Sequence, residues 1–371
     1  MKILTTHVGS LPGPPGFDPT AGMSDAQLAQ AVAWVVREQR AIGLDLINEG
    51  ELTKGGDWLA FMDNRLSGFE PRQVPAGTSI VARGKDREEF DDFYSWASAR
   101  QTLFFSADKR MQTARRYQVC VGPIHYAGGA ALEREIALLR AQVADPSQCF
   151  LTSTAPASLE PYRGNEYYAS AEAFVAALSE ALRSEYQAIV DAGFTLQIDD
   201  AWLVALWDRI GIGMGLAAFR ARCRERIEAL NHALRGIPAE KIRYHLCWGS
   251  WHGPHAHDLP FKDIVDLMLQ VNARYYSFEA ANVRHEHEYE LWREVKLPDG
   301  KVIIPGVVTH STDLIEHPQL VAQRIRRFAA LVGPENVIAG TDCGFGGRTH
   351  PQIAWAKLRA LTEGARLAAN P

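Results

Sequence analysis

Apolar residues recur at helical spacing in several segments of the chain. In residues 24–42, one face of the expected helix carries Leu28, Val32, Val35 and Val36. Ser24, followed three residues later by Gln27, is a capping-box pattern that predicts the start of this helix. Similar patterns predict helices over residues 170–192 and 320–331.

Eight short apolar runs lie between helical or irregular segments. They read KILTTHVGS, LDLINEGE, CFLTSTAPA, FTLQIDD, IRYHLCW, YYSFEAA, KVIIPGVV and NVIAGTDCG. Runs that are apolar almost throughout are typical of parallel strands buried on both faces. Eight such strands with intervening helices predict an α/β fold, the (β/α)₈ TIM barrel. A doubly wound open sheet is the alternative, but no run is followed by the GxGxxG motif.

Residues 55–147 are too long for a single crossover helix. We therefore expect an insertion after the second strand of a barrel that forms one domain over residues 1–371. The segment holds a charged run, RGKDREEFDDFYSW, and a further strand-like run, YQVCVGPIHYAG. A hairpin and helices that flank or cover the barrel mouth would account for both.

The composition is that of an ordinary globular protein, with 47% hydrophobic and 22% charged residues among 371. The net charge of −5 and the lack of a Lys/Arg block argue against nucleic acid as a partner. The apolar runs are far shorter than a membrane span, and the N-terminal sequence does not resemble a signal peptide. Five widely spaced cysteines do not predict a disulfide framework, so we expect a cytoplasmic protein whose thiols stay free or bind metal.

The segment YHLCWGSWHGPHAH carries the clearest candidate chemistry. His245 and Cys247 are two residues apart on an expected strand, so their side chains point to the same side. Strand C-termini converge at the mouth of a parallel barrel, and Glu279, Asp342 and Cys343 follow two later strands. One His, two Cys and one carboxylate suit tetrahedral Zn²⁺. For the His-x-Cys pair alone, a core histidine beside a buried cysteine is the alternative interpretation.

Five further histidines lie near these motifs in the sequence. His252, His255 and His257 follow the expected strand in a Gly/Pro-containing loop, and His285 and His287 begin an expected helix. An HxH pattern is compatible with metal binding, but histidines in loops or on the surface are commoner than ligands.

Six motifs, TTHVGSLP, NEGE, QIDD, HLCWG, FEAAN and GTDCGFG, occur in the order found in one known family. Over nearly its whole length the chain resembles the C-terminal, catalytic half of cobalamin-independent methionine synthase. It is similar in particular to single-domain relatives, which include the epoxyalkane:coenzyme M transferases. The resemblance implies a TIM barrel with zinc at its mouth, and it is specific for the superfamily rather than for a substrate.

The family's functional residues can be carried over to matching positions of the motifs. The resemblance implies that the zinc ligands are His245, Cys247, Glu279 and Cys343. It implies that the amino-acid thiol is bound by Val8, Ser10, Glu51 and Asp199. Two carboxylates from separate strand ends could hold a substrate ammonium group. The alternative is that both acids cap strand–helix junctions.

The chain departs from the methionine synthase pattern in three places. The N-terminal half of those enzymes has no counterpart in these 371 residues, which leaves polyglutamylated folate in doubt as the donor. After IPGV the family has an Asp and then a His that passes a proton to the leaving nitrogen. Here Thr309 stands at the place of the Asp, and His310 is one residue out of register. The family's QIDE has become QIDD, with Asp200 as a shorter acid.

These residues support a mechanism of thiol alkylation. Two cysteinates and a carboxylate would over-neutralise Zn²⁺, so a bound substrate thiolate would keep its electron density and attack an alkyl carbon. We therefore expect a zinc-dependent S-alkyltransferase, first of all one that transfers methyl to homocysteine in methionine biosynthesis. His310 is the candidate acid for a poor leaving group, and His7 is the second candidate.

Three other functions stay open. Opening of an epoxide by a sulfonate thiol would need cationic groups such as Arg348 or Arg284 near the pocket. A metal-dependent hydrolase would prefer His and carboxylate ligands, often with HxH on the first strand, where only His7 is present. A non-catalytic thiol- or amino-acid-binding protein could use a closed structural zinc site. The sequence leaves the alkyl donor, the thiol acceptor and the oligomeric state undetermined.

Overall fold

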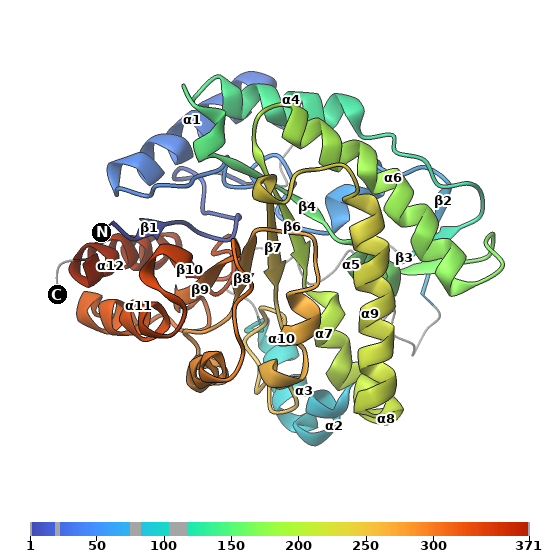
Figure 1. The fold of residues 1–371 in the computed structure, drawn as a ribbon. Helices are drawn as coiled ribbons and strands as arrows, with labels where there is room; N and C mark the ends of the chain where they lie inside the picture. Colours follow the sequence, from blue (N-terminus) through green and yellow to red (C-terminus); the bar gives the residue numbers. More distant parts are fainter. Residues whose placement is uncertain (1, 19–22, 75–82, 104–116, 370–371) are drawn as a thin grey trace.

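The computed structural model describes residues 2–18, 23–74, 83–103 and 117–369. Its central sheet has seven parallel strands in the order β1-β10-β9-β8-β7-β6-β4 (Figure 1). The strands are β1 (Leu4–Thr5), β4 (Phe150–Thr154), β6 (Thr195–Asp200), β7 (Ile242–Leu246), β8 (Tyr275–Phe278), β9 (Val302–Val308) and β10 (Ile338–Thr341). Each of the seven lies within one of the predicted runs, so the α/β class and seven of the eight strands are confirmed.

The eighth predicted run, LDLINEGE, is not an extended strand. It forms a single parallel bridge, between Ile47 and Cys149 at the edge of β4. The backbone N–H groups of residues 45–46 donate to the carbonyl of Thr5 in β1, so this segment touches both edge strands of the sheet. The run leaves the sheet soon afterwards, and Glu51 adopts a φ of 57°, which is incompatible with a strand.

Six long helices form the outer layer of the described residues (Figure 1). They are α1 (Asp25–Ala41), α4 (Gly129–Arg140), α6 (Ala171–Asp191), α9 (Leu216–Ala233), α11 (Pro318–Val332) and α12 (Pro351–Ala369). The predicted caps of α1 and α6 are confirmed, because the Ser24 and Ser170 hydroxyls accept hydrogen bonds from the backbone N–H of Gln27 and Ala173. Gly43 and Gly193 follow these two helices with φ values of 83° and 90°, as helix-ending glycines do.

Shorter helical segments fill the connections. The short α-helices are α2 (Lys85–Glu89), α3 (Asp91–Arg100), α5 (Pro156–Leu159), α7 (Trp202–Leu206), α8 (Ile212–Met214) and α10 (Val265–Met268). The 3₁₀ segments are η1 (Ala60–Asn64), η2 (Pro146–Gln148), η3 (Glu160–Tyr162), η5 (Ala239–Lys241), η6 (Phe261–Asp263), η7 (Glu286–Arg293) and η8 (Pro334–Asn336), and η4 (Trp207–Gly211) is a π-helical turn. Among the described residues, no helix combines the length and the apolar character needed to cross a membrane.

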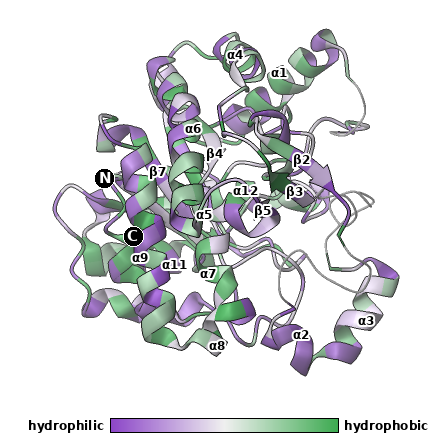
Figure 2. Cartoon of the chain, turned by 90° about the vertical axis from the view of Figure 1, so that its right-hand side faces the viewer, coloured by the Kyte–Doolittle hydropathy of each residue, from purple (hydrophilic) through white to green (hydrophobic). Residues whose placement is uncertain are grey.

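The predicted insertion, residues 55–147, contributes three kinds of structure where it is described. β2 (Phe69–Arg72) pairs antiparallel with β3 (Tyr117–Cys120), and β3 pairs parallel with β5 (Arg163–Asn165) in a small second sheet. The helices α2 and α3 stand apart from the outer layer, and α2 is strongly hydrophilic (Figure 2). The last part, α4, packs against α1 and α6 as an outer helix.

Candidate metal and substrate site

Two of the predicted metal ligands stand at the end of β7. His245 lies on this strand and Cys247 follows it by two residues, so their side chains share one side. Cys343 follows β10, and its thiol comes close to both. The candidate ligand atoms of the three residues lie within 4.8 Å of one another, and the two sulfurs are 3.9 Å apart. The structure thus brings together three of the four predicted ligands, all buried.

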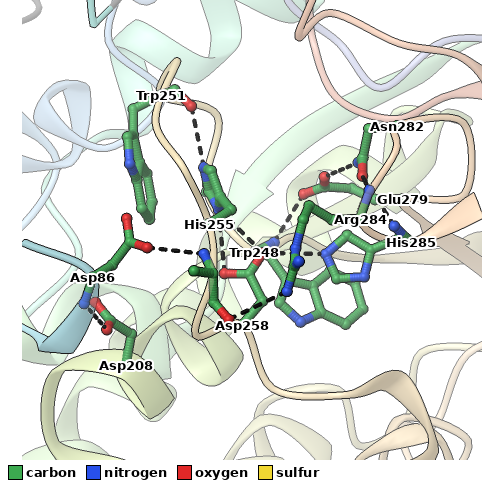
Figure 3. Close-up of polar contacts among 12 residues, drawn as sticks. Asp86, Asp208, Trp248, Trp251, His255, Asp258, Glu279, Asn282, Arg284 and His285 are labelled. Carbon is green, nitrogen blue, oxygen red and sulfur yellow. Dashed lines mark hydrogen bonds and ion pairs between the residues drawn. The ribbon is translucent and has the colours of Figure 1, made fainter. Parts of the chain in front are cut away.

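Glu279, the fourth predicted ligand, contacts this group through Cys247. Figure 3 shows it beside Asn282. The register between β7 and β8 brings it opposite Cys247. Its Oε1 atom lies 3.5 Å from the Cys247 sulfur and accepts a 2.9 Å hydrogen bond from the Trp248 backbone N–H. Its Oε2 atom accepts a 2.7 Å hydrogen bond from the Asn282 amide. Glu279 is therefore held next to the group of three, in contact with one of its sulfurs.

The two thiols carry unequal charge. The hydrogen bond from Cys247 lowers the pKa of Cys343 well below its usual range, against the opposing effect of burial, and the positive charge of Arg348 lowers it further. The same hydrogen bond, together with burial, raises the pKa of Cys247 well above its usual value. The Ser250 hydroxyl also donates to the Cys343 sulfur, at 2.8 Å. The negative charge of the pair therefore resides on Cys343.

The donor atoms of this group fit a metal ion. The Nδ1 atom of His245 lies 3.3 Å from the Ser277 hydroxyl, whereas its buried Nε2 atom has no hydrogen-bond partner of normal geometry among the described residues. Leaving a buried nitrogen unpaired costs about 1–3 kcal/mol. Two sulfurs and an imidazole nitrogen, with the Glu279 carboxylate nearby, are a donor set that Zn²⁺ accepts. His245, Cys247 and Cys343 could therefore hold a metal ion.

The predicted substrate-binding residues adjoin the metal ligands. Gln197 connects two of them, because its amide Nε2 donates to the carbonyl of Val8 and, at 2.8 Å, to Oδ1 of Asp199. The register between β6 and β7 pairs Asp199 with His245. Both residues lie near the C-terminal ends of their strands. Asp199 and Glu51, which together form the acidic corner, therefore open to the same side as the candidate metal ligands.

Glu51 reaches this corner from a strained backbone. Its φ of 57° lies in the left-handed region, which residues other than glycine adopt at a cost. The Thr152 hydroxyl donates to its Oε1 atom at 2.8 Å, and the carboxylate lies so close to Gly9 that a side chain there would collide with it. Because Gly9 separates Val8 from Ser10, this contact brings Glu51 to the end of the first strand. Strain of this kind is concentrated at functional sites.

Asp199 and Glu51 make the corner strongly acidic. Burial raises the pKa of Asp199 to about 7, and the negative charge of Glu51 also raises it, while His245 and Lys54 act in the opposite direction. A substrate ammonium group placed here would replace repulsion between the two carboxylates by attraction to both.

His310, the first candidate acid, lies near Cys343. The register of β9 and β10 pairs Val308 with Thr341, so the residues two positions later on each strand come close together. Burial lowers the pKa of His310 to about 3, which makes the imidazole neutral at physiological pH. Its Nδ1 atom has no hydrogen-bond partner within the described part of the chain. Thr309 uses its N–H to bind the Glu316 carboxylate at 2.8 Å.

His7, the second candidate acid, is directed toward α1. Its Nε2 atom lies 2.7 Å from the Gln39 amide oxygen, and its ring packs against Phe150 with the centroids 5.3 Å apart. Burial lowers the pKa of His7 to about 3. The structure therefore does not bring His7 into the group of candidate metal ligands among the described residues.

Comparisons with known proteins were made for the whole chain. No family model matches it. A protein named methionine synthase from Saccharolobus solfataricus (strain ATCC 35092 / DSM 1617 / JCM 11322 / P2) is 25% identical over 220 residues, 58% of this chain and 57% of that protein. One of the same name from Thermococcus kodakarensis (strain ATCC BAA-918 / JCM 12380 / KOD1) is 25% identical over 215 residues, 58% of this chain and 55% of that protein. The match thus spans little more than half the length of these relatives.

Two solved structures share the fold. A B12-independent methionine synthase from Shewanella sp. W3-18-1, in complex with selenomethionine, superposes with a TM-score of 0.74 at 19% identity, over 100% of this chain and 98% of that chain. A putative vitamin-B12 independent methionine synthase from Listeria monocytogenes gives 0.66 at 20% identity, over 99% and 98%. The resemblance to the cobalamin-independent methionine synthases is confirmed.

The residue that differs from the methionine synthase motif QIDE faces away from the site. Asp200 accepts hydrogen bonds from the Ser158 hydroxyl at 2.7 Å and from the Tyr244 hydroxyl at 2.9 Å. Successive strand residues point to opposite faces of a sheet. Asp199 therefore points to the face that carries the candidate site, and Asp200 points to the other face, against α5. The shorter acid therefore serves packing outside the site.

The other histidines lie outside the group of three ligands that the described residues form. His255 and His285 flank Asp258, at 3.1 Å and 3.3 Å, and the ring of His255 stacks on Trp251 (Figure 3). His257 lies 2.6 Å from Glu89 in α2. The remaining two are His252, whose backbone N–H binds the Leu103 carbonyl, and His287, which is exposed.

Several residues that shape the site were missed from the sequence. Gln197 and Asn282 hold Asp199 and Glu279 through side-chain amides, and both belong to the methionine synthase motifs QIDD and FEAAN, which carried the signal. The two arginines proposed for a sulfonate differ in burial: Arg284 is exposed, whereas Arg348 is buried and donates to the Ser10 hydroxyl at 3.3 Å.

Proposed function

We propose that this protein is a zinc-dependent S-alkyltransferase that transfers a methyl group to the thiol of homocysteine or of a similar acceptor. The observation that carries the proposal is the group of His245, Cys247 and Cys343 beside two acidic residues, Glu51 and Asp199. The relatives named methionine synthase support the same reaction class over the part of the chain that they match.

In this proposal the metal is Zn²⁺, held by His245, Cys247, Cys343 and Glu279. The ion would supply the substrate sulfur as a thiolate at neutral pH, where a free thiol with a pKa near ~8.5 is mostly protonated. The cysteine sulfurs keep the surroundings electron-rich, which favours attack on carbon. The Trp248 N–H and the Asn282 amide hold the Glu279 carboxylate whenever it is not a ligand.

The acceptor would be oriented by its amino-acid end. Asp199 and Glu51 bind the ammonium group, while Val8 and Ser10 line the same corner at the end of the first strand. Gln197 fixes Asp199 relative to Val8, so the corner is organised before the substrate arrives. With the ammonium group held there, the thiol extends toward Cys343 and His245.

His310 is the proposed acid for the leaving group. Burial keeps its imidazole neutral, so the ring would first have to take up a proton as negative charge on the bound reactants raises its pKa, and it would then pass that proton to the leaving atom. A well-placed acid contributes a factor of roughly 10²–10⁴. His7 has less support, since its ring is bound to Gln39 of α1.

We infer that residues 1–371 form one complete (β/α)₈ barrel with the insertion of residues 55–147. Segment 45–47 would be its eighth strand, reduced to a few backbone hydrogen bonds between β1 and β4. The site would then lie at the C-terminal mouth, where such barrels carry their chemistry.

One observation favours a second candidate function. Arg348 is buried beside Ser10 and could bind a sulfonate, as an epoxyalkane:coenzyme M transferase would require. The acidic corner of Glu51 and Asp199 argues for an amino-acid thiol instead. A metal-dependent hydrolase has less support, because His7 on the first strand is turned toward α1 and two thiolates would blunt the acidity of a bound water.

The proposal is tested by incubating zinc-loaded protein with homocysteine or coenzyme M and a panel of alkyl donors, and by measuring loss of free thiol. Zinc-edge absorption should show a new Zn–S contact when the acceptor thiol is added. A non-catalytic protein with a closed zinc site would show no new contact, and a hydrolase would consume no thiol.

A pair of cysteine variants provides the control. Cys343→Ser should lose zinc and at least about 10³-fold of the activity, because it removes both a ligand and the charged sulfur. Cys223→Ser changes a cysteine that is equally buried but lies in α9, and it should keep its zinc and its turnover. Full zinc content and full turnover in Cys343→Ser would place the site elsewhere.

A further inference from the structure

The described residues include six buried arginines, and two of them lack a carboxylate partner. The six are Arg65, Arg163, Arg226, Arg243, Arg324 and Arg348. Ion pairs of 2.6–2.8 Å join four of them to Glu135, Asp63, Glu160 and Glu286. No Asp or Glu of the described residues lies within 4.0 Å of the charged groups of Arg243 or Arg348. Because a buried cation without a counter-charge is costly, each of these two calls for another anion or for strong polar contacts.

Arg243 has its own partners. It donates to the Thr6 hydroxyl at 3.0 Å and to the His7 carbonyl at 2.9 Å, and its guanidinium lies 4.0 Å from the centroid of the Phe150 ring. Its Nε atom, like that of Arg348, has no hydrogen-bond partner among the described residues. The cation–π contact and two hydrogen bonds of normal length nevertheless stabilise the buried guanidinium without a ligand.

Arg348 is less well satisfied. Its Nη1 atom makes two long hydrogen bonds of 3.3 Å, to the Ser10 hydroxyl and to the Gly346 carbonyl. Its Nε atom is buried and has no hydrogen-bond partner among the described residues. A guanidinium with a free Nε and a second terminal nitrogen matches the two oxygens of a carboxylate or sulfonate. The Ser10 hydroxyl, which accepts from Arg348, still has its own proton to donate to such a group.

The position of Arg348 agrees with the acidic corner. Val8 contacts Gln197 and through it Asp199, whereas Ser10 contacts Arg348. Val8 and Ser10 are two residues apart, so the two backbone positions that contact these groups lie at most about 7 Å from each other. An α-amino acid carries its ammonium and carboxylate on one carbon and needs opposite charges at such a short separation.

We propose that Arg348, together with the Ser10 hydroxyl, binds the carboxylate of an α-amino-acid thiol whose ammonium group lies at Asp199 and Glu51. The assignment rests on the proposed function, in that the ligand is the acceptor of the transferred group. It makes Arg348 a specificity-determining residue that selects thiols with an anionic group next to the ammonium.

The competing explanation is that Arg348 only balances the thiolate of Cys343, which its charge also affects. The two explanations differ in what the ligand must carry. If Arg348 binds the substrate carboxylate, its loss should weaken the binding only of thiols that carry a carboxylate. If Arg348 only balances Cys343, its loss should weaken the binding of every thiol.

The test is calorimetric titration of the zinc-loaded protein with homocysteine and with 3-aminopropane-1-thiol, which lacks the carboxylate. 2-Sulfanylethanesulfonate and 5-methyltetrahydrofolate are titrated in parallel. Arg348→Met should weaken homocysteine binding by about 10–100-fold and change aminopropanethiol binding by less than about threefold. Arg284→Met, on the exposed arginine nearby, should change neither. Ser10→Ala should shift homocysteine binding in the same direction by a smaller factor, which gives a second measurement if Arg348→Met folds poorly.

The outcomes separate this inference from the proposed function. Equal weakening of both thiols by Arg348→Met, or weakening by Arg284→Met instead, would overturn the inference and leave thiol alkylation intact. A loss confined to 5-methyltetrahydrofolate would assign the arginine to the donor and would also overturn it. If 2-sulfanylethanesulfonate binds through Arg348 and homocysteine does not bind, both the amino-acid assignment and methyl transfer to homocysteine fail. If neither thiol binds, the inference and the proposed function fail together.

Discussion

At the scale of single residues, the site differs from the surrounding core because several of its residues have an energetically unfavourable charge, backbone conformation or unpaired polar atom. Asp199 is buried beside a second carboxylate, Glu51 adopts a left-handed backbone, and Nε2 of His245 has no hydrogen-bond partner of normal geometry in the described part of the chain. Each of these costs free energy in the ligand-free protein, and each would be relieved by the ligand that we propose for it, an ammonium group or a metal ion. Their coincidence at one place is a stronger argument for function than any one of them.

Asp199 makes the stability of the metal-free protein depend on pH. Its pKa is raised from 3.8 to about 7, so the folded state binds more protons than the unfolded state between these values. The free energy of unfolding should therefore fall as the pH rises from about 4 to about 7. Asp199→Asn should remove this loss and be more stable than the parent at pH 8, by as much as about 4 kcal/mol, while binding homocysteine more weakly. Denaturant unfolding at a series of pH values measures the first effect, and calorimetry measures the second.

The neighbouring acid provides the control for this prediction. Asp200→Asn changes a carboxylate on the opposite face of the same strand, where it accepts hydrogen bonds from Ser158 and Tyr244. Burial also raises the pKa of Asp200, to about 6, so Asp200→Asn should remove a smaller part of the pH dependence, over a lower pH range, and should leave homocysteine binding unchanged. Parallel pH profiles for Asp199→Asn and the parent protein would show that Asp199 is not the titrating group.

At the scale of elements, strand register explains why the motifs meet. The pairs Asp199–His245 and Val308–Thr341 are fixed by the parallel ladders, and the residues that follow them converge at the strand ends. The loops need additional support. The helix α2 supports the loop after β7, because Asp86 accepts a 2.8 Å hydrogen bond from the Ala256 N–H. Tyr94 of α3 binds Asp86 as well, and it accepts a 2.9 Å hydrogen bond from the Trp251 indole.

Asp86→Ala should loosen the loop after β7 without unfolding the sheet. It removes the carboxylate that receives the Ala256 N–H and the Tyr94 hydroxyl, and leaving two buried donors unpaired costs about 1–3 kcal/mol each. We expect faster amide hydrogen exchange over residues 249–258 and unchanged exchange in β6 and β8. Glu88→Ala, on the exposed side of the same helix, should leave the loop as protected as in the parent. Equal exchange in both variants would mean that the insertion does not hold this loop.

At the scale of the whole molecule, the sequence predicted what depends on periodicity and on motifs. Seven strands and the long helices α1, α6 and α11 lie where the apolar patterns placed them. The run LDLINEGE failed as a strand because its end bends into the left-handed conformation of Glu51, which apolar spacing does not reveal. The direction of the His7 side chain could not be predicted either. His7 lies beyond the two-residue strand β1, where side chains no longer alternate regularly between the two faces of the sheet. The buried charge of Arg243 resembled an ordinary surface residue in the sequence.

The charges that join residues 54–65 to the outer helices were likewise invisible in the sequence. Arg65 lies 2.6 Å from Glu135 of α4 and 3.0 Å from Glu185 of α6, and Lys54 lies 3.5 Å from Glu135. All four side chains are buried. The network therefore connects residues 54–65 with the outer helices α4 and α6. It also reaches strand β4, because the Ser153 hydroxyl donates a hydrogen bond to Glu185.

Glu135→Gln should destabilise the whole molecule through this network. It leaves Lys54 and Arg65 buried with less compensating negative charge, and breaking a buried ion pair from one side typically costs about 3–5 kcal/mol. Glu133→Gln, on the exposed face of the same helix, should change the free energy of unfolding by less than about 0.5 kcal/mol. Denaturant unfolding of the two variants at pH 7 measures the difference. Because the network spans the insertion and the outer helices, the unfolding of Glu135→Gln should stay a single transition that moves to lower denaturant. A separate early transition would show that the insertion unfolds independently and that these charges do not join it to the central sheet and its helices.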